Sequence, residues 1–286
     1  LRSMQLWQKF STLGILAAVM CAVPLWQVVQ YKNSELSVAR AEDAGWGQGR
    51  CSGTIYHGDH EHYAFLDEAF AMFGHGNALQ RDLCPSATRF EGEILAMALD
   101  LFHADAVTDG RPAGLVTSGG TDSILHAMLC YREAAYARGI ERPVLVAPET
   151  AHPAFAKAAH LFGMERRVVP VDPVTTLVDP AAVAAVVDGL DGRTAVIVGS
   201  AGNYPYGTID PITALGELAL DRGVGLHVDG CLGGFLLPFA EELGRVDQGW
   251  APFDFRVPGV SSISADTHKY GYGLKGTSTV LFRDVA

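Results

Sequence analysis

The chain has 286 residues, of which 49% are hydrophobic and 19% charged, so it can bury a core and does not have a disordered composition. Its formal net charge of −11 argues against a nucleic-acid partner, which usually binds a basic surface. Five cysteines without a CxxC pair argue against a disulfide framework or a metal site. They favour a reducing compartment, so we expect a cytoplasmic protein without a bound metal.

Residues 10–31 contain no charged side chain and are flanked by Lys9 and Lys32. The length of this run is near the roughly 20 residues that a membrane-spanning helix needs. Pro24 and Gln27 weaken that interpretation, because polar groups are costly in lipid. A signal peptide is a rival interpretation, although no clean cleavage site follows. A membrane anchor and a helix packed on a partner subunit both stay open.

Residues 1–60 are expected to form an N-terminal segment ending in a polar, glycine-rich linker, and residues 61–286 a large α/β domain. In the second region, short apolar runs alternate with segments of helical periodicity. Several runs are apolar on both faces, which is typical of a mostly parallel sheet covered by helices on both sides. The predicted strands are 114–117, 144–147, 166–171, 195–199, 225–228, 262–264 and 278–282, and the predicted helices are 63–73, 90–102, 122–138, 153–162, 180–188 and 212–222.

The segment 117–122 reads Thr-Ser-Gly-Gly-Thr-Asp and lies between a predicted strand and a long predicted helix. Glycines in such a turn let the backbone approach a ligand, and the following helix N-terminus attracts an anion. The segment matches neither nucleotide-binding glycine motif, so it does not indicate a nucleotide. Taken alone, it is better explained as an ordinary turn in which Ser118 or Thr121 caps the helix.

Asp229 directly follows the predicted strand 225–228. In an open parallel sheet, ligands bind at the carboxyl ends of the strands, so this carboxylate lies at a functional edge. A carboxylate in this position can keep a pyridine nitrogen protonated. The alternative, that Asp229 caps the glycine-rich turn at 230–234, is equally compatible with the sequence.

Lys269 lies in the segment 264–271, Ser-Ala-Asp-Thr-His-Lys-Tyr-Gly, after another predicted strand. A lysine between His and Tyr is unusual for a solvated surface residue. Partial burial is expected to lower its pKa and to prepare its amine for attack on an aldehyde. The alternative is a solvated lysine in a polar loop. The order of glycine turn, strand-end Asp229 and then Lys269 is more informative than any one of them.

From about Ser52 onwards, the chain resembles the fold type I pyridoxal-phosphate enzymes of the group II decarboxylase family. The resemblance is strongest in the segments 116–123, 227–235 and 261–276. It implies that pyridoxal 5'-phosphate is the cofactor and that Lys269 is the Schiff-base lysine. It also implies that Asp229 is the partner of the ring nitrogen and that His152 stacks on the ring. By the same resemblance, Gly120, Thr121 and His268 hold the cofactor phosphate, and Asn203 lies in a loop close to the cofactor.

Further matches indicate the lyase branch of this family, which cleaves phosphorylated long-chain amino alcohols into a long-chain aldehyde and phosphoethanolamine. Tyr56 matches a tyrosine that reaches the active site, and Lys275 a lysine that binds the substrate phosphate. Asn77 matches a residue given to the neighbouring subunit's phosphate site, which implies a homodimer with shared active sites. Gln80 is a departure, because the eukaryotic members carry a histidine there.

The resemblance leaves the proton transfers open among Tyr56, His152 and Lys269. Two other functions stay open. An amino-acid decarboxylase on the same scaffold would need a donor aimed at a substrate carboxylate. An inactive fragment is the other, because the sequence stops at Ala286 without the small C-terminal domain that the resemblance implies.

Overall fold

The computed structural model describes residues 38, 41, 56, 59–245 and 251–285. The chain divides into two compact units, Leu1–Ile55 and Tyr56–Ala286, and the fold described below is that of the second. The predicted anchor at 10–31 lies outside the described residues. Within the described part of the chain, no helix is both long enough and apolar enough to cross a membrane.

Seven strands of the described residues form one sheet in the order β1-β7-β6-β5-β4-β2-β3. Strands β3, β2, β4, β5 and β6 run parallel, and β7 lies antiparallel between β6 and β1. The strands are β1 Ala113–Thr117, β2 Val144–Pro148, β3 Glu165–Val169, β4 Thr194–Ser200, β5 Gly225–Asp229, β6 Ser262–Ala265 and β7 Ser278–Phe282. The sheet is therefore mostly parallel, as predicted.

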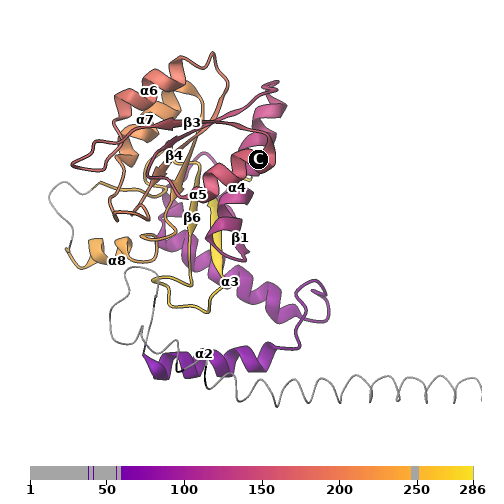
Figure 1. Cartoon of the computed structure of the whole chain (residues 1–286). Helices are drawn as coiled ribbons and strands as arrows, with labels where there is room; N and C mark the ends of the chain where they lie inside the picture. Colours follow the sequence, from indigo (N-terminus) through magenta and orange to yellow (C-terminus); the bar gives the residue numbers. More distant parts are fainter. Residues whose placement is uncertain (1–37, 39–40, 42–55, 57–58, 246–250, 286) are drawn as a thin grey trace, which may run out of the picture. The chain divides into compact units, whose positions relative to one another are not determined.

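Helices cover both faces of this sheet (Figure 1). The helices are α2 His60–Phe73, α3 Pro85–Leu101, α4 Gly120–Ala137, α5 Pro153–Phe162, α6 Pro180–Asp188, α7 Ile212–Arg222 and α8 Leu237–Glu242, with a short 3-10 turn at Ala104–Ala106. Alternate residues of the strands pack into two separate apolar clusters. Val144 and Ile197 belong to the cluster that includes α6 and α7, whereas Leu145 and Val196 belong to the cluster that includes α4 and α5.

The observed boundaries agree closely with the sequence where proline or glycine marks an end. Helices α5, α6 and α7 have the predicted limits, and α5 and α6 begin with a proline, whose fixed φ suits a first helical turn. Helix α8 was not predicted. Helix α4 begins earlier than predicted, at Gly120.

The predicted cap of helix α4 was wrong. Gly119 is the N-cap, with φ of +142°, and no side chain caps the helix. Thr121 lies within the first turn, while Ser118 donates from its backbone N–H and its hydroxyl to Asp122 Oδ2, at 3.0 and 3.1 Å. The physical reason is the φ of Gly119, which is favourable only for glycine. The first N–H groups of α4 are therefore left without a side-chain cap.

Candidate active site

The site forms where strands β5 and β6 end side by side. Asp229 is the last residue of β5 and lies opposite Ser264 of the parallel neighbour β6. Lys269 lies in the loop that leaves β6. The carboxyl ends of adjacent parallel strands point to the same edge of a sheet, so the fold brings these two predicted residues to one region.

A cavity of about 530 Å³ opens at this edge. The N-terminus of α4 forms one wall, with Gly119, Gly120 and Thr121. A side chain at Gly120 could not be accommodated, because its Cβ would lie 2.6 Å from Asp266 Oδ1. An 18-residue helix whose first N–H groups lack a side-chain cap offers donors and a positive dipole end to an anion.

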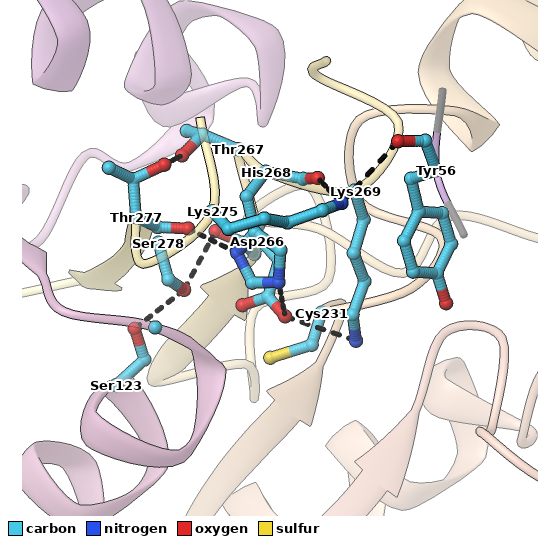
Figure 2. Close-up of polar contacts among 12 residues, drawn as sticks. Tyr56, Ser123, Cys231, Asp266, Thr267, His268, Lys269, Lys275, Thr277 and Ser278 are labelled. Atoms are coloured by element: carbon cyan, nitrogen blue, oxygen red, sulfur yellow. Dashed lines mark hydrogen bonds and ion pairs between the residues drawn. The ribbon is translucent and has the colours of Figure 1, made fainter. Parts of the chain in front are cut away.

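Lys269 lines the same cavity together with Asp266 and His268, and Figure 2 shows these three side chains close together. Its Nζ lies 3.0 Å from Asp266 Oδ2. Burial alone lowers the pKa of Lys269, but Asp266, together with Cys231 and Asp229, outweighs burial and raises this pKa above its usual value. The predicted lowering of the lysine pKa is therefore wrong, because the sequence pattern did not reveal a carboxylate in contact with the amine.

Two histidines reach the same cavity. His268 Nδ1 lies 2.6 Å from the Thr277 carbonyl oxygen, so Nδ1 donates to that carbonyl. His152 Nδ1 accepts the backbone N–H of Ala154 at 3.1 Å and is the N-cap of α5. The ring of His152 also meets Tyr204 edge-on, with 5.2 Å between ring centroids. His152 therefore begins a helix and lines the cavity at the same time.

Asp229 and Asn203 are buried, and neither is among the residues that line the cavity. Asp229 Oδ1 accepts the N–H of Cys231 at 3.0 Å, so this carboxylate does cap its glycine-rich turn. Cys231 itself lines the cavity. Asn203 Oδ1 accepts the N–H of Tyr206 at 2.9 Å, and its amide donates to Thr208. Asn203 therefore stabilises the loop that carries Tyr204.

The predicted substrate residues are divided between two places. Tyr56 lies close to both lysines, with its ring centroid 5.9 Å from Lys269 Nζ and 5.1 Å from Lys275 Nζ (Figure 2). Lys275 Nζ donates to the carbonyls of His268 and Tyr56, at 3.0 and 3.4 Å. Burial, and then the charge of Lys269, lower the pKa of Lys275. Lys275 thus belongs to the edge of the site.

Asn77 and Gln80 lie in an exposed turn between α2 and α3. Asn77 Oδ1 accepts the N–H of Leu79 at 3.0 Å, and the backbone N–H of Gln80 donates to the Asn77 carbonyl. Neither residue is among those that line the cavity. The described chain therefore does not bring Asn77 into its own site.

Two residues of the cavity wall, Asp266 and Cys231, were not among the predicted site residues. Asp266 is 3% exposed, and its Oδ1 has no hydrogen-bond partner in the described structure. The sequence signal that could have identified it is its position three residues before Lys269, which suits a turn that returns the carboxylate to the amine.

The described residues fit pyridoxal phosphate. An uncapped helix N-terminus with two glycines suits a phosphate, and a lysine lines the same cavity. A buried carboxylate ends the neighbouring strand, and a histidine ring is available to cover a planar ligand. A mostly parallel α/β sheet with these groups at one edge defines the class of fold type I pyridoxal-phosphate enzymes.

The family model described as the pyridoxal-dependent decarboxylase conserved domain matches residues 56–286. The chain therefore belongs to the pyridoxal-dependent decarboxylase family, and pyridoxal phosphate is the cofactor of that family.

Among its relatives, the sphingosine-1-phosphate lyase of Arabidopsis thaliana is 46% identical over 250 residues. The match covers 86% of this chain and 44% of that protein. The structure of the Burkholderia pseudomallei sphingosine-1-phosphate lyase is 56% identical, with a TM-score of 0.84 over 90% of this chain and 58% of that one. A Lactobacillus brevis glutamate decarboxylase shares the fold, with a TM-score of 0.67 and 24% identity over 80% of this chain and 52% of that one. The chain thus spans about half the length of these relatives.

Proposed function

We propose that this protein cleaves the Cα–Cβ bond of a phosphorylated long-chain amino alcohol of the sphingosine-1-phosphate type. The products are a long-chain aldehyde and phosphoethanolamine. The identities of 46% and 56% to two sphingosine-1-phosphate lyases support this substrate class. The observation that carries the proposal is the position of two lysines, Lys269 and Lys275, near the ring of Tyr56. One amine serves the cofactor, and the other remains for an anionic group of the substrate.

Each cofactor-binding residue has a separate task. Pyridoxal phosphate, when bound, supplies an electron sink for the charge left at Cα. Lys269 holds it covalently, Asp229 keeps its ring nitrogen protonated, and His152 covers the ring. The cofactor phosphate would be held by Gly120 and Thr121 at the start of α4, together with His268, which lines the same cavity.

The substrate phosphate carries nearly two negative charges and needs compensation where water is partly excluded. Lys275 provides this charge at the edge of the site. Its ammonium group now satisfies the carbonyls of His268 and Tyr56, and these weak neutral contacts are replaceable by a charged one. The specificity of the enzyme for a phosphorylated substrate therefore depends on Lys275.

Cleavage takes a proton from the substrate 3-hydroxyl and returns a proton to Cα. Burial raises the pKa of Tyr56, and the opposing effect of the Lys269 charge does not cancel it, so the phenol stays protonated at neutral pH. Tyr56 therefore acts as a hydrogen-bond donor. The acceptor of the hydroxyl proton is then His152 or the free amine of Lys269.

The working unit that we propose is a homodimer with shared active sites, in which Asn77 contributes to the partner's site. Helix α2 supports this proposal, because none of its residues is buried and Phe65, Phe70 and Met72 are exposed. Asn77 follows this helix in an exposed turn.

For the protein in the cell, we propose a cytoplasmic location with residues 10–31 at a membrane. The complete chain should pellet with membranes and resist extraction with carbonate, and a chain that starts at Asn33 should not pellet.

The test is a product assay on the complete chain supplied with pyridoxal phosphate. Sphingosine-1-phosphate should give a long-chain aldehyde and phosphoethanolamine, and unphosphorylated sphingosine should give far less. Carbon dioxide release from glutamate or an aromatic amino acid, without aldehyde formation, would overturn the proposal in favour of a decarboxylase.

A further inference from the structure

Asp266 is a buried carboxylate beside the cofactor lysine, and the proposed chemistry gives it no task. We propose that Asp266 is the resting partner of Lys269: its carboxylate holds the Lys269 ammonium group whenever that amine is not joined to the cofactor. This inference rests on the proposed function only in taking Lys269 as the lysine that binds the cofactor.

The geometry of the pair is specific. Lys269 Nζ lies 3.0 Å from Asp266 Oδ2, and the backbone N–H of Lys269 donates to the Asp266 carbonyl at 3.2 Å. The side chain of Asp266 is 3% exposed and that of Lys269 18% exposed, so solvent screens the pair weakly. Figure 2 shows the two side chains turned toward each other.

Asp266 has few other sources of compensation. Its Oδ1 is buried without a hydrogen-bond partner in the described structure. His268 Nε2 lies at 3.8 Å from Oδ2, which is too far for a hydrogen bond. A buried carboxylate is costly unless it is compensated. The positive N-terminal end of α4 lies beside Asp266 at Gly120, and the ammonium group of Lys269 is the full charge in direct contact with it.

The other charged and titratable groups around the pair are already engaged. Lys275 Nζ donates to two backbone carbonyls, and Cys231 Sγ donates to Ser264 Oγ at 3.3 Å. Asp229 accepts the N–H of Cys231, and Tyr56 stays a neutral phenol. Asp266 is therefore the carboxylate in direct contact with the lysine amine.

The consequence concerns the moment when the substrate amine takes the place of Lys269. The amine of Lys269 leaves as a neutral group, and once it takes up a proton that the substrate gives up, Asp266 holds the resulting ammonium group. A protonated amine cannot attack again as a nucleophile, so the pair protects the exchange from reversal. Asp266 is in this sense a positioning residue that acts through Lys269.

The test measures the titration of Lys269 in the complete chain after removal of the cofactor. Trace labelling with acetic anhydride between pH 6 and 11, followed by peptide mass analysis, gives the midpoint for each lysine. The Asp266→Asn variant should lower the midpoint of Lys269 by at least about one pH unit, because a neighbouring opposite charge is lost. Exposed Lys157 is the internal reference and should not change.

Two control variants separate charge from structure. Asp188→Asn removes a carboxylate paired with Arg222 on the surface and should leave the Lys269 midpoint unchanged. Asp266→Glu restores the charge and should return the midpoint toward the wild-type value. An unchanged midpoint in Asp266→Asn overturns the proposal, and does so whether or not the product assay detects a lyase.

If Asp266→Asn does not fold, a measurement on the wild type still tests the proposal. In the cofactor-free chain carrying ¹³C-methylated lysines, Lys269 should titrate above the ordinary lysine value of about 10.4. A midpoint below that value would overturn the proposal without any variant.

Discussion

On the cofactor side of the cavity, Asp229 ends strand β5, and Lys269 follows its hydrogen-bonded neighbour β6. On the substrate side, Tyr56 precedes helix α2, and Lys275 lies in the loop before β7, where its Nζ donates to the carbonyls of His268 and Tyr56. The sheet thus places Asp229 directly and Lys269 through the turn that leaves β6, whereas the second pair lies in segments outside the sheet. Changes on the cofactor side should therefore remove the chemistry, and changes on the substrate side should alter substrate recognition.

The largest effect is expected for Lys269→Ala. Without the amine there is no covalent attachment to the cofactor aldehyde, so the absorption band of that bond should disappear and aldehyde formation should fall to background. Absorbance with and without borohydride, and a product assay, measure the two effects. Lys157→Ala is the matched control on the surface. A borohydride-sensitive band that persists in Lys269→Ala contradicts the assignment.

Asp229→Asn should keep the cofactor but lose most of the turnover. A neutral amide can still accept the N–H of Cys231, but it cannot keep a ring nitrogen protonated. We expect kcat to fall by roughly two orders of magnitude, which is about 2.7 kcal/mol of transition-state stabilisation. Steady-state kinetics with saturating cofactor measures this. Near-normal kcat would show that Asp229 serves only as a cap of its turn.

Lys275→Ala should weaken recognition of the substrate phosphate and leave cofactor binding unchanged. Loss of one charged hydrogen bond to the substrate phosphate should cost roughly 1.5–3 kcal/mol in kcat/KM. The cofactor absorption band should not change, because the cofactor phosphate is held elsewhere. Kinetics on sphingosine-1-phosphate and sphingosine provides the comparison. An unaltered preference for the phosphorylated form would refute the role of Lys275.

The smallest effect is expected for Asp210, which contacts strand β4 next to the strand that carries Asp229. Asp210 Oδ2 accepts the N–H of Ser200 at 2.8 Å, and Ser200 lies opposite Asp229 in the sheet. Burial raises the pKa of Asp210 to about 6, with a smaller effect of Asp229. A raised carboxyl pKa contributes stability that is present below its ordinary pKa of 3.8 and lost as pH rises through about 6.

The wild type should therefore lose roughly 1–2 kcal/mol relative to Asp210→Asn between pH 5 and pH 7.5. Urea unfolding of both proteins at the two pH values measures the difference. A difference that is independent of pH would show that Asp210 does not titrate in this range.

The sequence predicted the placement of Asp229 and Lys269 at one edge of the sheet for a physical reason. Strand-end residues such as Asp229 are placed by hydrogen-bonded ladders, whose apolar pattern is visible along the chain. The raised pKa of Lys269 was missed, because it depends on a contact with Asp266 that no periodicity encodes. The capping of α4 was missed because it depends on the φ of Gly119. Helix α8 has only six residues, too few to show a helical period.

The site of covalent attachment is the most direct test of the account. The complete chain loaded with pyridoxal phosphate is reduced with borohydride and digested, and the cofactor-bearing peptide is sequenced by mass spectrometry. The account predicts that the modification lies on Lys269, within the segment that follows β6. Modification of Lys275 or Lys157, with Lys269 unmodified, would contradict it.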